Sequence, residues 1–301
     1  MKLYYFQDPK GNFGDDLNPW LWRKLMPEVL NDDPDVLLVG IGTILNHRLP
    51  AAPMKHILGS GVGYGNLPKV DERFVFHSVR GYATAAALGL SPDLVITDAA
   101  VMLRKVVDVS KHAKSQEFGF MPTGHSERHF DWATLCKDVG FRFISCHWSV
   151  DKVIEEIAQC KVLISEAMHG AIAADALRVP WIPIMLDDNV LPSKWIDWLS
   201  TLDLPYEPVL ITPICDNKRI FNVSGRLKNR FKSALKSNGI WSFRWTDPMP
   251  LTSAASVRPL VQKQLQALKN KVPYLSDESL IDTHVLRYEK VIEELKRSYG
   301  R

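Results

Sequence analysis

Short apolar runs alternate with stretches of helical periodicity along the first two thirds of the chain. A short, β-rich apolar run with turn residues on both sides predicts a strand buried on both faces. Strands are predicted at residues 3–6, 36–41, 56–58, 74–79, 94–97, 118–121, 141–145, 162–164 and 181–185. Helices are predicted between them at residues 17–25, 82–88, 130–139, 150–159 and 171–177. This alternation predicts an α/β fold with mainly parallel sheets and crossover helices.

A polar stretch at residues 105–117 interrupts the alternation, which then restarts. We interpret this stretch as a linker between two Rossmann-like domains that face each other across a cleft. The predicted regions are 1–108, 115–215 and a C-terminal region, 216–301, with helices at 255–269 and 278–299. We expect the last helix to pack back on the first domain. Loops at the carboxyl ends of the strands of both domains would then meet at one site.

Two polar loops occupy equivalent places in the two halves. The first, after residues 3–6, contains Asn12, Asp15 and Asp16, and either aspartate is predicted to cap the helix at 17–25, with Pro19 in its first turn. Its glycines and the following helix start favour an anionic or hydroxyl-rich ligand, although an ordinary turn capped by Asp15 is the alternative. The second is predicted as a loop over residues 122–128.

A histidine and a glutamate lie where a strand passes into a helix. Glu166 and His169 fall between the strand at 162–164 and the helix at 171–177. A histidine near its usual pKa delivers a proton at neutral pH, and Glu166 is predicted to orient His169 or raise its pKa. The alternative is that a backbone carbonyl satisfies His169. Since no second histidine lies four residues away, we expect no metal here.

Cationic groups at the ends of other strands predict an anion site. Arg80 ends the strand at 74–79, where it would grip a carboxylate or phosphate, and a structural salt bridge is the alternative. In the second half, the backbone of Gly124 and Ser126 would form an anion nest, with His125 and Arg128 as cationic donors. Together these groups predict a site for a small phosphorylated anion.

Composition narrows the class of protein. The 301 residues carry a formal net charge of +3, which is too small to predict nucleic acid as a partner. The four cysteines show no zinc spacing and are expected to be reduced thiols, which favours the cytoplasm. The start of the chain lacks the pattern of a signal peptide, and no apolar run approaches the roughly 20 residues that span a bilayer.

Positive charge is concentrated in one segment, residues 217–246, which contain eight Lys or Arg and no Asp or Glu. Apolar residues at helical spacing and nearby aromatics accompany it: Leu227, Phe231, Ala234, Leu235, Trp241, Phe243 and Trp245. A basic amphipathic segment of this kind is typical of contact with an anionic membrane surface. The alternative is a solvated helix with one stripe that faces the core.

The order of the motifs resembles the polysaccharide pyruvyl transferase family, in particular its bacterial exopolysaccharide ketal-pyruvyltransferase branch. The matching stretches are Asn-Phe-Gly-Asp-Asp-Leu-Asn at 12–18, Gly-Ile-Gly-Thr at 40–43, Ser-Val-Arg-Gly at 78–81, Pro92-Asp93 with Asp98, and Ser-Glu-Ala-Met-His-Gly-Ala at 165–171. They span roughly residues 1 to 190. The resemblance implies a fold like that of the GT-B glycosyltransferases, with phosphoenolpyruvate as donor, a sugar hydroxyl pair as acceptor and no cofactor.

The resemblance also implies roles for single residues. His169 takes the place of the histidine implicated in catalysis in an Arg-Leu-His-type motif, and Ala167 stands where that motif has arginine. Either Arg80, His125 or Arg128 compensates for this arginine, or this branch grips its donor differently. Expected donor contacts are Arg80, Thr123, Gly124, His125, Ser126, Arg128 and Gly170. Expected acceptor contacts are Asn12, Asp15, Asp16, Gly42 and Thr43, with His169 as general acid supported by Glu166.

Two other functions fit the same sequence features. A GT-B glycosyltransferase would bind a nucleotide sugar, although no acidic motif that reads a base or ribose is evident in the second half. A non-catalytic partner in exopolysaccharide assembly would bind membrane or lipid-linked glycan through residues 217–246. Because acceptors in exopolysaccharide synthesis are commonly lipid-linked oligosaccharides, we expect a cytoplasmic protein with salt-sensitive peripheral contact at the inner face of the plasma membrane.

Overall fold

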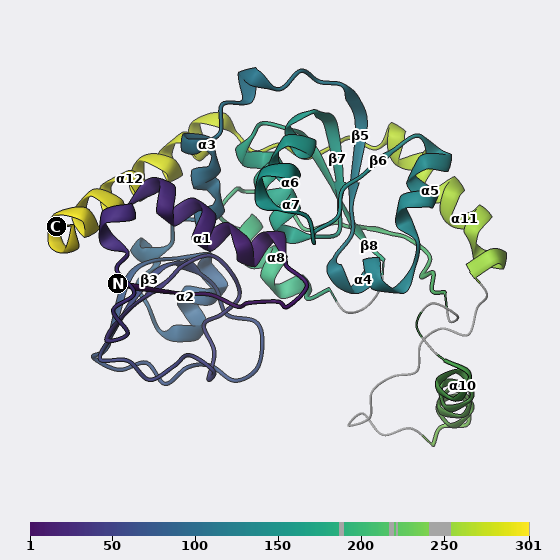
Figure 1. Cartoon of the computed structure of the whole chain (residues 1–301), viewed down its shortest axis with the longest axis horizontal. Helices are drawn as coiled ribbons and strands as arrows, with labels where there is room; N and C mark the ends of the chain where they lie inside the picture. Colours follow the sequence, from purple (N-terminus) through teal and green to yellow (C-terminus); the bar gives the residue numbers. More distant parts are fainter. Residues whose placement is uncertain (187–189, 217–219, 221, 241–253, 301) are drawn as a thin grey trace.

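Two parallel sheets with helices packed against them form the body of the protein, an α/β fold (Figure 1). The computed structural model describes residues 1–186, 190–216, 220, 222–240 and 254–300. All strand pairs within the two sheets are parallel. The loops at the carboxyl ends of the strands therefore gather at one edge of each sheet, as the alternating pattern predicts.

The first sheet has the strand order β1-β2-β3-β4. Its strands are β1 (Lys2–Tyr4), β2 (Val36–Val39), β3 (Met54–Ser60) and β4 (Phe74–Val79). Its helices and 3₁₀ turns are α1 (Phe13–Leu25), η1 (Pro27–Val29), α2 (Tyr82–Leu88), η2 (Pro92–Leu94), η3 (Ala99–Met102), α3 (Leu103–Val106) and η4 (Val109–Lys111). The order follows the chain, so the described part of this sheet winds in one direction.

The second sheet has the order β6-β5-β7-β8-β9, which reverses between β5 and β7. Its strands are β5 (Gln116–Met121), β6 (Arg142–Phe143), β7 (Cys160–Ser165), β8 (Trp181–Met185) and β9 (Val209–Leu210). Its helices are α4 (Gly124–His129), α5 (Trp132–Val139), α6 (Val150–Ala158), α7 (Met168–Ala176) and α8 (Pro192–Leu199). Doubly wound sheets bind ligands where the order reverses. Here that point lies beside the loops after β5 and β7.

After β9 the described residues form three further helices: α10 (Val223–Ser237), α11 (Ala254–Ala267), which continues into η5 (Leu268–Asn270), and α12 (Glu278–Tyr299). α11 packs on α5 of the second sheet, whereas α12 packs on η1 and η3 beside the first. Tyr288 of α12 is fully buried and donates to the carbonyl oxygen of Thr97 at 2.6 Å. None of the described helices is both long and apolar enough to cross a membrane.

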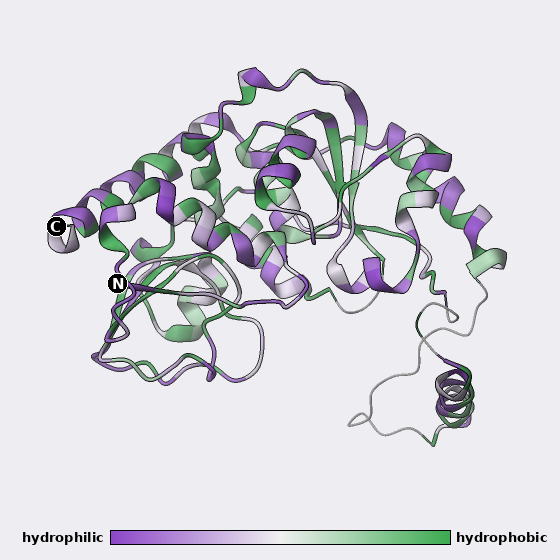
Figure 2. Cartoon of the chain, viewed as in Figure 1, coloured by the Kyte–Doolittle hydropathy of each residue, from purple (hydrophilic) through white to green (hydrophobic). Residues whose placement is uncertain are grey.

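One apolar core continues from the first sheet into the second. It contains Leu17 and Trp22 of α1, Val153 of α6, Ile172 of α7 and Tyr288 of α12. α1 belongs to the first sheet by sequence, yet it packs against α6 and α7 of the second. Figure 2 shows hydrophobic residues on the strands and hydrophilic residues on the outer helices. The two sheets are therefore joined through shared helix contacts.

The start of α1 differs from the prediction. The helix begins at Phe13, and Asn12 caps it by accepting from the backbone N–H of Gly14 at 3.2 Å. Asp16 returns a bond by accepting from the N–H of Asn12 at 2.9 Å, so the predicted cap at Asp15 or Asp16 is wrong. Pro19 lies inside the helix. Proline has no backbone N–H, so Pro19 cannot donate to the carbonyl of Asp15, four residues earlier. That carbonyl accepts instead from the Asn18 side-chain amide at 3.1 Å.

Three other predicted elements need correction. Residues 94–97 form no strand, because Pro92 and the Ser91 cap produce the turn η2 and only Val95 makes a bridge, to Val79. The predicted loop at 122–128 contains the helix α4, capped by Thr123. α7 begins at Met168 rather than at residue 171, so its first turn includes His169. Trp241, Phe243 and Trp245 lie outside the described residues.

Candidate active site

A cavity of about 420 Å³ lies at the carboxyl ends of strands from both sheets. Its volume is within the range of small-molecule sites. Its lining includes ten predicted site residues: Asn12, Asp15, Thr43, Thr123, Gly124, His125, Arg128, Glu166, His169 and Gly170. Asp8, Arg48, His147 and Lys194 add further polar and charged groups. Loops after strands of both sheets therefore line one cavity, and the roles expected of these ten residues stay predictions.

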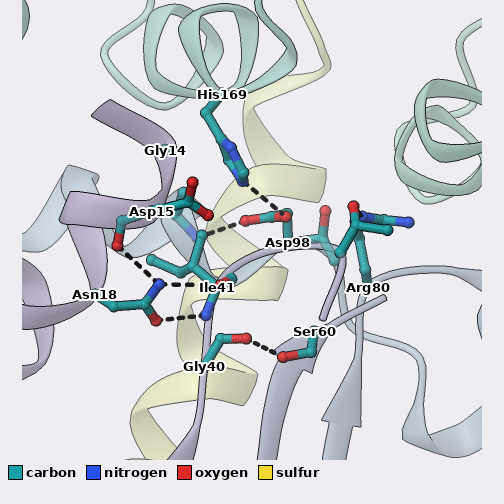
Figure 3. Close-up of polar contacts among 12 residues, drawn as sticks. Gly14, Asp15, Asn18, Gly40, Ile41, Ser60, Arg80, Asp98 and His169 are labelled. Atoms are coloured by element: carbon teal, nitrogen blue, oxygen red, sulfur yellow. Dashed lines mark hydrogen bonds and ion pairs between the residues drawn. The ribbon is translucent and has the colours of Figure 1, made fainter. Parts of the chain in front are cut away.

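His169 faces a buried carboxylate across the interface between the sheets. Its Nε2 lies 3.6 Å from Oδ2 of Asp98, a residue with no exposed surface (Figure 3). The other oxygen, Oδ1, accepts from the N–H of Ala100 at 3.0 Å. Neither Nε2 of His169 nor Oδ2 of Asp98 has a hydrogen-bond partner in the described structure. The two side chains therefore face each other as a close pair inside the protein.

Asp98 was not among the predicted catalytic residues. Sequence analysis placed it after an expected strand and within the family motif, but named Glu166 as the partner of His169. In the structure the Glu166 carboxylate accepts from the backbone N–H and hydroxyl of Thr123 at 2.8 and 2.9 Å, and from the N–H of Leu186 at 3.2 Å. Glu166 therefore holds the start of α4 in place, while Asp98 supplies the carboxylate that faces His169 Nε2.

Gly14 gives the His169 ring its position. The ring lies so close to the Gly14 Cα that any β-carbon on residue 14 would overlap His169 Nδ1 (Figure 3). Gly14 belongs to α1 and His169 to α7, so this approach requires glycine for lack of a side chain rather than for backbone freedom. It explains one residue of the Asn-Phe-Gly-Asp-Asp-Leu-Asn motif.

Asp15 is the acidic group whose ionisation the site changes most clearly. Burial raises the pKa of its carboxyl from 3.8 to about 6, with further upward effects from Asp16 and Asp8 and opposing attraction from His169 and Lys194. In the described part of the chain, no donor forms a hydrogen bond with this carboxylate. A carboxyl that titrates near neutral pH is suited to proton transfer.

Asn18 fixes this part of α1 against the first sheet. Its buried amide donates to the carbonyls of Asp15 and Ile41 at 3.1 and 3.0 Å, and its oxygen accepts from the N–H of Ile41 at 2.8 Å. The indole of Trp22 donates to the same oxygen at 3.2 Å. The loop after β2 and the Asp15 backbone are therefore held by one side chain (Figure 3).

Two arginines line the cavity without ion pairs. Arg48 comes from the segment after β2, and Arg128 lies on α4. No carboxylate of the described residues lies within 4.0 Å of either guanidinium. Lys194 also lines the cavity, with its ammonium 3.0 Å from the Tyr64 hydroxyl. Unpaired arginines in a cavity are suited to a carboxylate or phosphate ligand. Arg128 was predicted and Arg48 was missed.

Arg80 is not in the cavity. Its side chain is fully buried, pairs with Asp197 at 3.0 Å and donates to Thr43 Oγ1 at 2.7 Å and to the Val62 carbonyl at 3.0 Å. Gly61 leaves room for the guanidinium, since a β-carbon there would overlap it. The predicted donor contact is therefore replaced by the structural salt bridge that was its alternative, because all faces of the guanidinium are occupied by protein.

Three other predicted contacts do not line the cavity: Asp16, Gly42 and Ser126. Asp16 is used in the α1 cap, and Ser126 is buried within α4. His147, which sequence analysis did not consider, lines the cavity after β6. Its Nδ1 lies 2.6 Å from the Gly11 carbonyl oxygen, which holds the proton on Nδ1 and leaves a lone pair on Nε2.

Glu127, Cys146 and His147 come together beside this wall, with one ligand atom of each within 4.8 Å of the others. Burial raises the pKa of the Cys146 thiol to about 12, with a further upward effect from Glu127. Glu127 also accepts from the Ser145 hydroxyl at 2.6 Å. The thiol is therefore protonated at neutral pH. The expectation that the enzyme uses no metal stays a prediction.

This cavity, with a histidine, buried carboxylates and unpaired arginines at the strand ends of an α/β fold, is the kind of site that a transferase of an anionic group needs. A sequence model of the polysaccharide pyruvyl transferase family matches residues 3–188. The chain belongs to this family and is a polysaccharide pyruvyltransferase. It is also similar to the succinoglycan biosynthesis protein ExoV of Rhizobium meliloti (strain 1021), with 33% identity over 329 aligned residues that cover 99% of this chain and 100% of that protein.

Proposed function

We propose that the enzyme transfers pyruvate from phosphoenolpyruvate to a pair of hydroxyls on a sugar of an exopolysaccharide or its lipid-linked precursor. The products are a cyclic pyruvate ketal and inorganic phosphate. The observation that carries the proposal is the position of His169, between buried Asp98 and the titratable Asp15, in a cavity with unpaired arginines. The name of the relative, a succinoglycan biosynthesis protein, supports an exopolysaccharide acceptor.

The chemistry begins with proton transfer. His169 donates a proton to the methylene carbon of phosphoenolpyruvate, which makes the adjacent carbon electrophilic. Because Nε2 faces Asp98, we assign the transferred proton to Nδ1, with Asp98 stabilising the positive ring. A sugar hydroxyl oxygen bonds to the electrophilic carbon, and the bond from that carbon to the phosphate oxygen breaks. The second hydroxyl then closes the ketal ring.

Donor binding is assigned to the cationic side of the cavity. Arg128, Arg48 and His125 lie where a carboxylate and a phosphate require positive partners, together with the N-terminal backbone of α4 at Thr123 and Gly124. Arg48 is thus a further group that compensates for the family arginine replaced by Ala167. These donors stabilise the departing phosphate most strongly as its charge develops.

Acceptor binding is assigned to the opposite wall, from Asn12, Asp15 and Thr43. Asp15, with a pKa raised to about 6, accepts a proton from the attacking hydroxyl at neutral pH. We propose further that the two sheets correspond to the two halves of a GT-B-like fold, without any nucleotide, metal or other cofactor, and that the enzyme works in the cytoplasm.

The experiment is phosphate release from phosphoenolpyruvate with the lipid-linked glycan as acceptor, for the wild type, His169→Gln and Asp98→Asn. We expect His169→Gln to abolish turnover, because the general acid is removed. We expect Asp98→Asn to lower kcat by about 100-fold or more, because the carboxylate that orients the general acid is lost. Thermal shift with phosphoenolpyruvate reports binding separately, because a ligand stabilises only the folded state. Near-normal turnover of His169→Gln contradicts the mechanism, and stabilisation by UDP- or GDP-sugars alone assigns glycosyl transfer instead.

A further inference from the structure

The helix α10 carries an apolar stripe that is open to solvent. Val223, Leu227 and Phe231 are spaced by four residues, so they lie along one side of the helix. Their side chains are 66%, 63% and 66% exposed. The alternative from sequence analysis, a stripe that faces the core, is therefore wrong for Leu227 and Phe231. Exposed apolar residues in a row indicate an interaction surface rather than scattered surface residues.

Cationic side chains flank this stripe on both sides. At 100° per residue, Arg226 and Arg230 follow one border of the stripe, and Lys228 lies past the other. The fifteen residues of α10 contain five Lys or Arg and no Asp or Glu. The helix therefore offers a hydrophobic face bordered by positive charge, without acidic groups that would repel an anionic surface.

The position of α10 leaves this face accessible. In Figure 1 the helix lies apart from both sheets, at the side of the molecule opposite α12. Figure 2 shows hydrophilic and hydrophobic residues along it. Asn222 caps its start by accepting from the N–H of Gly225 at 2.8 Å, which satisfies one of the free backbone N–H groups of the first turn.

We propose that α10 docks this enzyme on an anionic lipid bilayer. The helix lies in the plane of the membrane, with Val223, Leu227 and Phe231 inserted among the acyl chains. Arg226, Lys228 and Arg230 then lie at the level of the lipid phosphates. Strong positive charge beside a narrow apolar stripe matches the chemistry of an interfacial helix. Docking would bring the cavity to a lipid-linked acceptor, and this purpose rests on the proposed function. The binding of α10 to lipid does not depend on it.

The test is co-sedimentation of the full chain with phosphatidylcholine vesicles, with and without phosphatidylglycerol, at low and high salt. We expect binding only to the anionic vesicles and release near 1 M salt, where the Debye length falls to about 3 Å. Phe231→Ser should weaken binding by about tenfold or more, from the loss of a buried aromatic side chain. Arg230→Ser should weaken binding to anionic vesicles by about fivefold, because the attraction of one cationic side chain to the anionic lipid surface is lost.

Leu286→Ser is the matched control. Leu286 is 57% exposed on α12, so the substitution removes a comparable apolar side chain far from α10 in sequence. We expect this variant to bind vesicles like the wild type. No binding to anionic vesicles at low salt overturns the proposal. Equal effects of Phe231→Ser and Leu286→Ser on vesicle binding also overturn it. So does an enzyme that ignores pure lipid vesicles and sediments only with proteoliposomes that carry an acidic membrane protein.

The membrane-docking proposal and the proposed pyruvyl transfer can be tested independently of each other. Phe231→Ser is expected to keep the wild-type rate of phosphate release with a detergent-dispersed acceptor, because Phe231 lies on α10 and not in the cavity. With acceptor embedded in anionic vesicles, the same variant should lose rate in proportion to its lost binding. Vesicle binding by a protein that lacks transferase activity would refute the proposed function and leave the docking surface supported.

Discussion

Replacement of Asp15 by Asn should stabilise the folded enzyme while it removes activity. The folded state favours the protonated form of this carboxyl, because burial raises its pKa from 3.8 to about 6. Stability from this group is fully present below pH 4 and is lost as the pH rises through about 6. At pH 7.5 the ionised carboxylate therefore remains a destabilising group. Asparagine has nearly the same shape and carries no charge.

The magnitude follows from the shift. A rise from 3.8 to about 6 is roughly two pH units, and one unit corresponds to about 1.4 kcal/mol, so the ionised group costs about 3 kcal/mol at pH 7.5. The attraction of His169 and Lys194 is already included in this net shift. Because the Asn amide is itself desolvated, we expect a gain of about 1 to 3 kcal/mol in the free energy of unfolding.

The assay is urea unfolding of wild type and Asp15→Asn at pH 7.5 and at pH 4. The stability gain should appear at pH 7.5 and vanish at pH 4, where both proteins carry a neutral group. Asp16→Asn is the matched control, since its carboxylate caps the N–H of Asn12, and its loss should destabilise the protein by about 1 kcal/mol. A variant Asp15→Asn that is no more stable than wild type at pH 7.5 refutes the reasoning.

Two other substitutions test the positions of single side chains. Gly14→Ala places a methyl group in the space of the His169 ring and should lower kcat by about 100-fold or more; normal turnover would show that the ring does not depend on Gly14. Arg80→Met leaves Asp197 buried without its partner and should destabilise the fold by about 3 to 5 kcal/mol in denaturant titrations, with an unchanged KM for phosphoenolpyruvate. A raised KM with unchanged stability would return Arg80 to the donor site.

Sequence patterns predicted β1 to β8 and most helices, because a parallel sheet buried on both faces requires continuous apolar runs. The two-residue strand β9 was missed, since it is too short to show a pattern. The wrong predictions concern short single segments of the chain. Residues 94–97 are as apolar as a strand, but the turn at Pro92 leaves only Val95 in a bridge. Apolar pattern does not show such turns, which depend on backbone hydrogen bonds rather than on burial.

Most of the predicted site residues line the cavity, because loops after parallel strands meet at one edge. The partner of each residue could not be predicted. Asp98, Glu166 and Arg80 are all charged groups that follow a predicted strand, and sequence position does not distinguish them. Only the structure shows that Asp98 faces His169, that Glu166 binds Thr123 and that Arg80 is buried against Asp197. Such pairings depend on the relative position of the two sheets, about which a pattern along one strand carries no information.

The contacts of α12 affect the stage of protein synthesis at which the enzyme becomes active. Tyr288 of α12 donates to the carbonyl of Thr97, and Arg287 donates to those of Val95 and Asp93 at 2.7 Å each, so α12 holds the segment that ends at Asp98. A chain still on the ribosome has made His169 and the cavity loops, but not the helix that fixes the carboxylate opposite His169. Full activity is therefore expected only once α12 has been synthesised and has packed against this segment.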